Sequence, residues 1–103
     1  MLPNDIKTRI DADFGSDGAK GVTASLERFI AAFRTTYKHH PGDRVIRCVL
    51  QLAEGKVSDL EHYMKAALQD WRDVVYWAEY TKDEVRIFDF DLPFEYAARK
   101  NAV

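Results

Sequence analysis

The sequence predicts a mostly α-helical fold: four or five helices as successive antiparallel hairpins, with an extended or single-strand C-terminal segment. The main observation is that apolar side chains between residues 58 and 80 return every three or four positions, which places them on one helix face. Shorter stripes of the same spacing precede this segment. Only one stretch, near the C-terminus, alternates as a β-strand does, and a lone strand would leave its backbone unpaired.

We expect the 103 residues to form a single helical domain. Apolar residues make up 47% of the chain and charged residues 31%, a balance typical of globular rather than disordered proteins. The expected parts are a first helix (1–14), a glycine-rich loop (15–22), a helical core (23–80), an extended strap (81–96) and a tail (97–103).

The first helix is predicted from Pro3, which suits a first turn, and from Ile6, Ile10 and Phe14, which recur every four residues. Three glycines between residues 15 and 21 interrupt this pattern. They predict the loop that separates the first helix from the helical core.

The helical core begins with a helix that starts near Thr23 and ends before Pro41, because the residue preceding a proline avoids the helical region. The next helix, residues 45–53, has apolar side chains around most of its circumference. This pattern predicts that it is the central helix of the fold, with Gly55 at its C-terminal cap.

The segment from residue 58 to residue 80 opens with Ser58-Asp59-Leu60-Glu61, which matches a capping box in which Ser58 and Glu61 bond each other's backbone amides. Two interpretations of its length stay open. The apolar stripe favours one helix of about 22 residues, whereas Asp70 could cap a separate last helix.

The strap contains an alternating stretch, residues 85–92, with Phe88, Phe90 and Leu92 on one side and Asp89 and Asp91 on the other. It either crosses the helices through its phenylalanines or pairs with a copy of itself. We expect the phenylalanines to be buried against the helices, with a homodimer as an extension of this arrangement.

Charge is spread unevenly along a chain whose formal net charge is −2. A candidate basic patch lies between residues 28 and 47 and comprises Arg34, Lys38, Arg44 and Arg47. It is the one feature that suggests nucleic-acid binding. The acidic balance of the whole chain argues against such a partner, because nucleic-acid-binding domains are usually basic.

The compartment is suggested by a single cysteine, Cys48, which excludes an internal disulfide framework and suits a reducing environment. We find no signal-peptide pattern at the N-terminus and no apolar run of the ~20 residues needed to cross a membrane. A cytoplasmic location without membrane contact is therefore expected.

Metal and catalytic sites are not indicated. Asp13 and Asp17 lie near glycines, but the loop lacks the remaining calcium ligands. His39 and His40, with Asp43, provide too few ligands for a zinc site, and paired histidines before a proline are typical of a helix C-terminus. We therefore predict no catalytic residue, metal ligand or cofactor, although whether the chain is an enzyme stays open.

Aromatic residues concentrate near the end of the helical core and in the strap. Tyr76, Trp77 and Tyr80, together with Phe88 and Phe90, form a candidate interaction surface, because exposed tryptophan and tyrosine are typical interface anchors. The alternative is the rim of the core, with the tyrosine hydroxyls reaching water.

The segment Gln69–Tyr80 resembles parts of small bacterial proteins of unassigned function, and this resemblance implies no site residue. The predicted function is a non-catalytic, cytosolic protein-interaction module that binds an unknown protein partner. Self-association as a homodimer is an optional addition to this prediction. One alternative is nucleic-acid binding through the basic patch. Another is a small enzyme or ligand binder that uses a cleft between helices.

Overall fold

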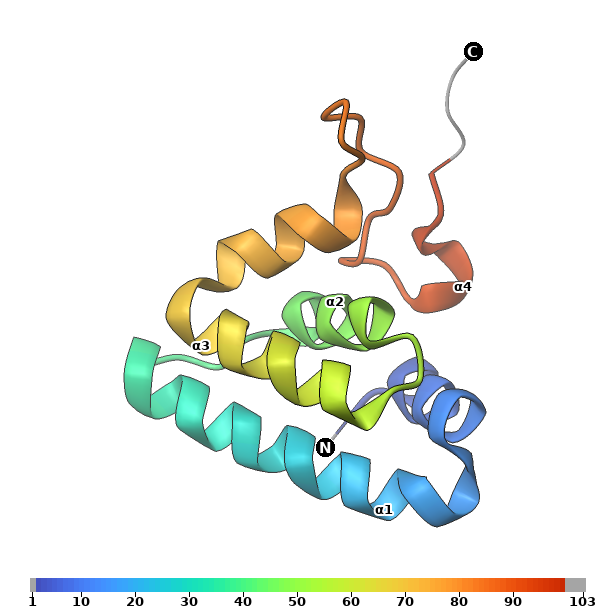
Figure 1. The fold of residues 1–103 in the computed structure, drawn as a ribbon, viewed down its shortest axis with the longest axis vertical. Coiled ribbons are helices and arrows are strands. Elements are labelled where there is room, and N and C mark those ends of the chain that lie inside the picture. The colour runs from blue at the N-terminus through green and yellow to red at the C-terminus, as the bar shows by residue number, and fades with distance from the viewer. Residues whose placement is uncertain (1, 100–103) are drawn as a thin grey trace.

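A computed structural model describes residues 2–99 of the chain. This part is mostly helical, with four helices: α1 (Asn4–Tyr37), α2 (Asp43–Ala53), α3 (Val57–Glu79) and α4 (Phe94–Ala97). Pairing of β type within residues 2–99 is limited to two isolated bridges, so no sheet forms there. Figure 1 shows a bent α1 along one edge, α2 and α3 packed beside it, and α4 near the start of α1.

Gly15 divides α1 into two helical parts. Its φ of 72° and ψ of 168° are not helical, and glycine reaches a positive φ at little cost. The helix resumes at Ser16, so the predicted loop over residues 15–22 is wrong except at its first residue. Val22 is buried and Ala19 packs against the core. Packing of this segment therefore outweighs the low helix propensity of its later glycines.

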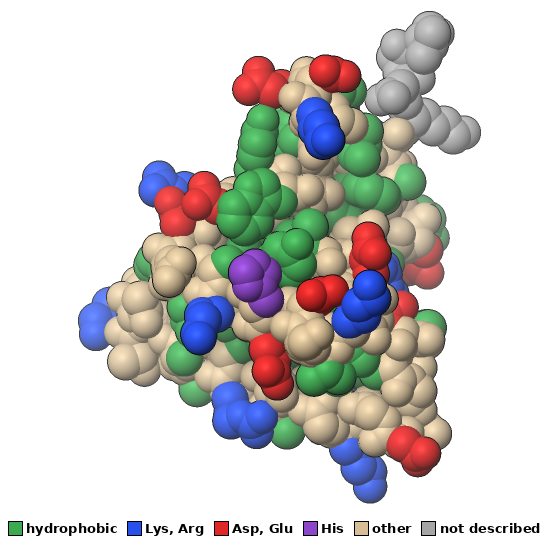
Figure 2. Space-filling model, in the orientation of Figure 1, with side chains coloured by type: hydrophobic (Ala, Val, Ile, Leu, Met, Phe, Trp, Pro, Cys, Tyr) green, Lys and Arg blue, Asp and Glu red, His purple; other side chains and the backbone are tan. Residues whose placement is uncertain are grey.

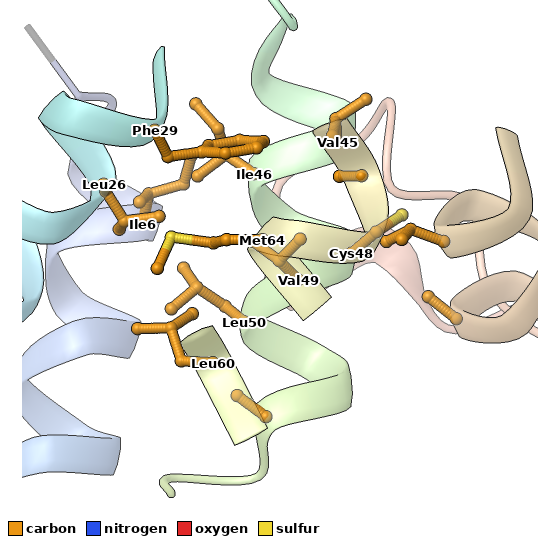
Figure 3. Packing of buried hydrophobic residues seen from close by; sticks show 14 of the residues in the cluster. Ile6, Leu26, Phe29, Val45, Ile46, Cys48, Val49, Leu50, Leu60 and Met64 are labelled. Atoms are coloured by element: carbon orange, nitrogen blue, oxygen red, sulfur yellow. The ribbon is translucent and has the colours of Figure 1, made fainter. Parts of the chain in front are cut away.

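α2 is buried around most of its circumference, which confirms that it is the central helix. Its buried side chains are Val45, Ile46, Arg47, Cys48, Val49, Leu50 and Ala53. Figure 3 shows several of them among Ile6 and Leu26 from α1 and Leu60 and Met64 from α3. The core thus lies where the three long helices meet.

The turn after α2 passes close to the first half of α1. Gly55 in this turn has a φ of 76°, and a Cβ atom placed there would lie 3.0 Å from the backbone oxygen of Asp13. A side chain at this position would have to push the two backbones apart, and its φ would be strained. The C-cap of α2 is Glu54, so the predicted C-cap, Gly55, is one residue too late.

Asp70 interrupts α3, with a φ of −158° and a ψ of 101°. Its Oδ1 accepts a hydrogen bond of 3.1 Å from the Arg72 backbone N–H, so the carboxylate caps the helical turns that follow. The Leu68 carbonyl, which loses its helical partner at this break, accepts a hydrogen bond of 3.0 Å from the Tyr37 hydroxyl. The structure thus favours the second interpretation, in which Asp70 begins a separate helical segment.

Ser58 does not cap α3. The helix begins at Val57, its N-cap is Lys56, and no side chain caps that end. Ser58 is exposed within the first turn, so the predicted capping box is wrong. The start is set instead by the turn from α2, in which the Lys56 N–H donates to the Ala53 carbonyl at 3.0 Å.

We expect Asp70→Ala to lower the stability of the protein clearly more than Ser58→Ala, because only Asp70 bonds the amide of a new helical turn. The midpoint of urea unfolding for the two variants measures this difference. Equal midpoints would contradict the capping role of Asp70.

The strap folds back between the end of α3 and the residues around α4. The Ile87 N–H donates to the Glu79 carbonyl at 2.7 Å, and the Ile87 carbonyl accepts from the Arg99 N–H at 2.9 Å. Phe90 is 1% exposed and Phe88 is half-buried, whereas Leu92 is 43% exposed and so leaves the side predicted for it. These hydrogen bonds show that the strap finds backbone partners within its own chain. The sequence pattern did not reveal these partners.

The predicted tail begins too early, because Ala97 is buried and lies in α4. The Asp89 N–H donates to the Ala97 carbonyl at 2.8 Å, which ties this residue to the strap. Residues 100–103 of the predicted tail lie outside the described residues.

Candidate interaction surface

The most exposed aromatic side chains of α3 line a groove of about 370 Å³. We call this site the aromatic groove; it is lined by Tyr76, Trp77, Tyr80, Thr81 and Lys82. Tyr76 is 43% exposed and Trp77 is 49% exposed. In Figure 2 hydrophobic side chains gather over the C-terminal half of α3, and acidic side chains lie at the turn above it.

Helical spacing places these side chains on the outside. Tyr80 follows Trp77 by three residues and Tyr76 by four, so the three side chains lie on one outer side of the helix end. Val74 and Val75, between them and the bend, point into the core. The aromatic side chains are therefore not needed to close the core beneath them.

The rings support one another at fixed separations. The Tyr76 and Tyr80 rings are stacked, with centroids 5.2 Å apart and planes inclined by 18°. Trp77 contacts Tyr63 edge to face at 6.3 Å, and Tyr63 in turn contacts His62 at 5.0 Å. The bend at Asp70 lies between Tyr63 and Trp77 in the sequence. The aromatic groove is thus a partly ordered surface rather than a set of separate side chains.

Acidic groups border the aromatic groove. The Tyr76 hydroxyl lies 3.5 Å from Glu84 Oε1, at the limit of a hydrogen bond. Desolvation, followed by the charge of Glu84, raises the pKa of Tyr76. Asp83 and Asp73 are exposed nearby in sequence, with Lys82 as the cation of the lining.

The two phenylalanines of the predicted surface lie elsewhere. Phe90 is buried in the core, and Phe88 stacks on it with ring centroids 5.0 Å apart. Their side chains anchor the strap, so the predicted surface is wrong for Phe90 and holds only three of its five residues together. The sequence pattern could not distinguish a strap anchor from a surface residue. Alternation predicts which side of the segment a side chain occupies, but not which other part of the chain covers that side.

The predicted basic patch is largely neutralised. Arg44 donates to both carboxylate oxygens of Glu79, at 3.0 and 2.6 Å. Arg47 is buried and donates to both oxygens of Asp5, at 2.8 and 3.1 Å. Half of the predicted patch therefore serves the fold, and its exposed members are Arg34 and Lys38.

Glu79 is the polar residue that the sequence analysis missed. Its side chain is fully buried, and it accepts hydrogen bonds from Arg44, Arg86 and the Phe90 amide. Burial alone would raise the pKa of Glu79, but the hydrogen bonds from Arg44 and the Phe90 amide, with the charges of both arginines, hold it below its ordinary value. The sequence contained a signal for the burial of Glu79. Glu79 stands four residues after the buried Val75, so helical spacing places both on the same face.

This buried cluster ties separate segments of the fold together. Every buried side-chain nitrogen and oxygen within residues 2–99 has a hydrogen-bond partner. Arg47 also donates to the Phe90 carbonyl at 3.1 Å, and Asp5 accepts from the Phe94 amide at 3.1 Å. The hydrogen bonds of Arg47 lower the pKa of Asp5 against the effect of burial. The charged groups thus fasten the strap to α1, α2 and α3.

The single cysteine and the paired histidines have local structural surroundings. Cys48 is buried, and desolvation followed by the charge of Glu79 raises its pKa, which keeps it a thiol. His40 Nδ1 accepts a hydrogen bond of 2.8 Å from the Gly42 N–H and so supports a turn. In the described part of the chain, no three histidine, cysteine or acidic side chains converge to hold a metal ion.

A second groove, of about 310 Å³, lies between α1 and α3. Phe29, Met64 and Leu68 contribute its apolar side chains, and Arg28 and Lys65 stand at its edge. Leu68 is half-buried and lines this groove. The groove is the interhelical cleft that the ligand-binding alternative requires, and Glu61 is the one carboxylate in its lining.

No protein-family model, curated protein or solved structure matches this chain. Among the residues described, none of the helices is both long enough and apolar enough to span a membrane.

Proposed function

We propose that this protein is a non-catalytic protein-interaction module and that the aromatic groove is its docking surface. The observation that carries the proposal is the exposure of Tyr76 and Trp77, each nearly half open to solvent on the outer stripe of α3. Large aromatic side chains bury much area at a low entropic cost, so they dominate the affinity of many interfaces. The cytosol is the proposed location, because the only cysteine has no disulfide partner in the chain.

The competing view, that these rings are only the rim of the core, accounts less well for their positions. Val74, Val75 and Ala78 already close the inner face of the same turns. Trp77 is held edge to face by Tyr63 without being covered. A ring that is ordered and uncovered contributes little to folding and is suited to contact with a partner.

Nucleic-acid binding receives less support. Arg44 and Arg47 are paired with carboxylates, which leaves Arg34 and Lys38 as the exposed members of the predicted patch. A nucleic acid gains most of its affinity from several phosphate contacts. Retention on DNA or RNA that falls steeply with salt would contradict the proposal and favour this alternative.

The test compares tagged wild-type protein with the double variant Tyr76→Ala/Trp77→Ala in cells of the source organism. We expect one or a few proteins to co-purify with the wild type in stoichiometric amounts and to be lost with the double variant. Tyr96→Ala/Val57→Ala is the matched control, because both residues are exposed hydrophobics away from the groove.

Circular dichroism should show that all of these variants keep the helical fold. A partner retained equally by the double variant would contradict the proposal. So would wild-type protein that brings down no stoichiometric partner and stays monomeric in sedimentation equilibrium.

A further inference from the structure

Carboxylates outnumber cations around the aromatic groove. Asp73 precedes Tyr76 and Trp77 by one helical turn on the same outer stripe, and Asp83 and Glu84 form the exposed turn beyond Lys82. Three exposed acidic side chains thus lie within a few residues of a groove whose lining contains one lysine. The groove favours a ligand that carries positive charge.

The neighbouring arginine on α3 is held mainly by Asp70. Arg72 donates to both oxygens of Asp70, at 3.0 and 3.1 Å, and the charge of Asp73 acts on it as well. The carboxylates of Asp83 and Glu84, on the other side of the rings, therefore supply the negative charge that is available to a partner.

The rings themselves favour a guanidinium group among cations. Arginine is planar, stacks on the faces of tryptophan and tyrosine, and binds a carboxylate through two parallel N–H donors. The chain contains this arrangement elsewhere: the Arg9 guanidinium lies 4.6 Å above the centre of the Phe94 ring and bonds Asp13 at 2.7 Å. Within residues 2–99, the rings of Tyr76, Trp77 and Tyr80 make no such contact with a cation.

The polar group in the lining of the groove favours an extended segment. The lining brings Lys82 next to the rings. An extended peptide has free backbone carbonyls, which an ammonium group can bind. Lys82 is therefore suited to bind the backbone of such a ligand, and the carboxylates are suited to bind its cationic side chain.

We infer that the aromatic groove binds an extended, arginine-bearing segment of a partner protein, with the guanidinium over Trp77 or Tyr76 and against the carboxylates of Asp83 and Glu84. This inference rests on the proposed function and adds the chemical class of the partner to it.

The test titrates the full chain with the capped peptide Ac-Gly-Arg-Pro-Arg-Gly-NH2, followed by amide and indole chemical shifts. Matched peptides carry lysine or citrulline in place of arginine; citrulline keeps the planar shape but has no charge. We expect shifts confined to Tyr76, Trp77, Tyr80 and the turn after α3. The lysine peptide should bind several-fold more weakly, and the citrulline peptide should not saturate.

Three variants complete the design. Trp77→Ala and the double variant Asp83→Asn/Glu84→Gln should each weaken the arginine peptide by about fivefold or more. Glu61→Gln is the matched control, because it removes an exposed carboxylate on the first half of α3 and should leave binding unchanged. Equal binding of the three peptides, or equal weakening by Glu61→Gln, would overturn the inference.

Two further outcomes separate the inference from the proposed function. A partner captured through Trp77, with no response to the arginine peptide or to Asp83→Asn/Glu84→Gln, would leave the function in place and overturn the inference. Self-association that depends on Trp77 but not on these acids would assign the groove to a second copy and overturn it as well. Capture that does not depend on Trp77 would remove the function and the inference together.

Discussion

Replacing Glu79 with alanine should lower the free energy of unfolding by about 3 kcal/mol, the lower end of the range for breaking a buried ion pair. The change removes a fully buried carboxylate and leaves Arg44 and Arg86 without their shared partner. It also leaves the buried Phe90 amide without an acceptor. The lower end applies because the two arginine side chains keep 32% and 25% exposure, so water can replace part of what they lose.

Urea unfolding monitored by circular dichroism measures this loss, with Glu84→Ala as the control. Glu84 is an exposed carboxylate five residues along the chain, where a surface substitution should change stability by less than about 0.5 kcal/mol. A Glu79→Ala variant as stable as the control would show that the cluster contributes little to folding.

The same residue predicts the response to acid. The pKa of Glu79 is lower in the folded protein than its ordinary value, so Glu79 binds its proton more readily in the unfolded chain. Its contribution to stability is therefore complete above the ordinary carboxylate pKa and is lost as the pH falls through the folded-state value. Glu79→Gln should flatten the decline of stability with acid, leaving the part that Asp5 contributes with the same sign.

Phe90→Ala should cost about 3–5 kcal/mol, the usual range for deleting a buried phenylalanine side chain. Phe90 is almost fully buried, stacks on Phe88 and contacts Phe94 edge to face at 5.7 Å. Its backbone is fastened at both polar atoms, by Glu79 and by Arg47. The side chain and the backbone therefore hold the strap at the same point.

Leu92→Ala is the matched control, because Leu92 lies two residues further along the strap and is largely exposed. We expect it to change stability by less than about 0.5 kcal/mol. Amide exchange adds a local measurement: in Phe90→Ala the N–H groups of Ile87 and Arg99, which bond across the strap, should exchange faster. Unchanged unfolding and unchanged exchange would show that Phe90 does not anchor the strap.

Both predictions concern residues that the sequence analysis treated differently. Phe90 was predicted both as buried and as part of an interaction surface, and the structure places it in the core. Glu79 was not singled out from the sequence, although its side chain is fully buried. The tests of folding and of binding use different residues. Substitutions of Glu79 and Phe90 test folding, whereas substitutions of Trp77 and Glu84 test binding, so the two sets of results are independent.

The features that depend on the spacing of nearby residues were predictable from the amino-acid sequence. Apolar periodicity placed the inner and outer faces of α3 and identified α2 as the central helix. The same periodicity left Tyr76 and Trp77 beside the buried stripe, and the structure exposes both. These predictions succeed because helical geometry relates residues three and four apart without reference to the rest of the fold.

The features that depend on contacts between distant residues follow from the packing of the folded chain. Arg44 meets Glu79 across 35 positions of sequence, and Arg47 meets Asp5 across 42, so two members of the predicted basic patch bind carboxylates of the fold. The helix also continues past Gly15, and the hydroxyl of Tyr37 satisfies the bend at Asp70, because the packing of other segments stabilises these local choices. Local spacing specifies which face a side chain occupies, but what lies opposite that face is fixed by contacts between segments far apart in the chain.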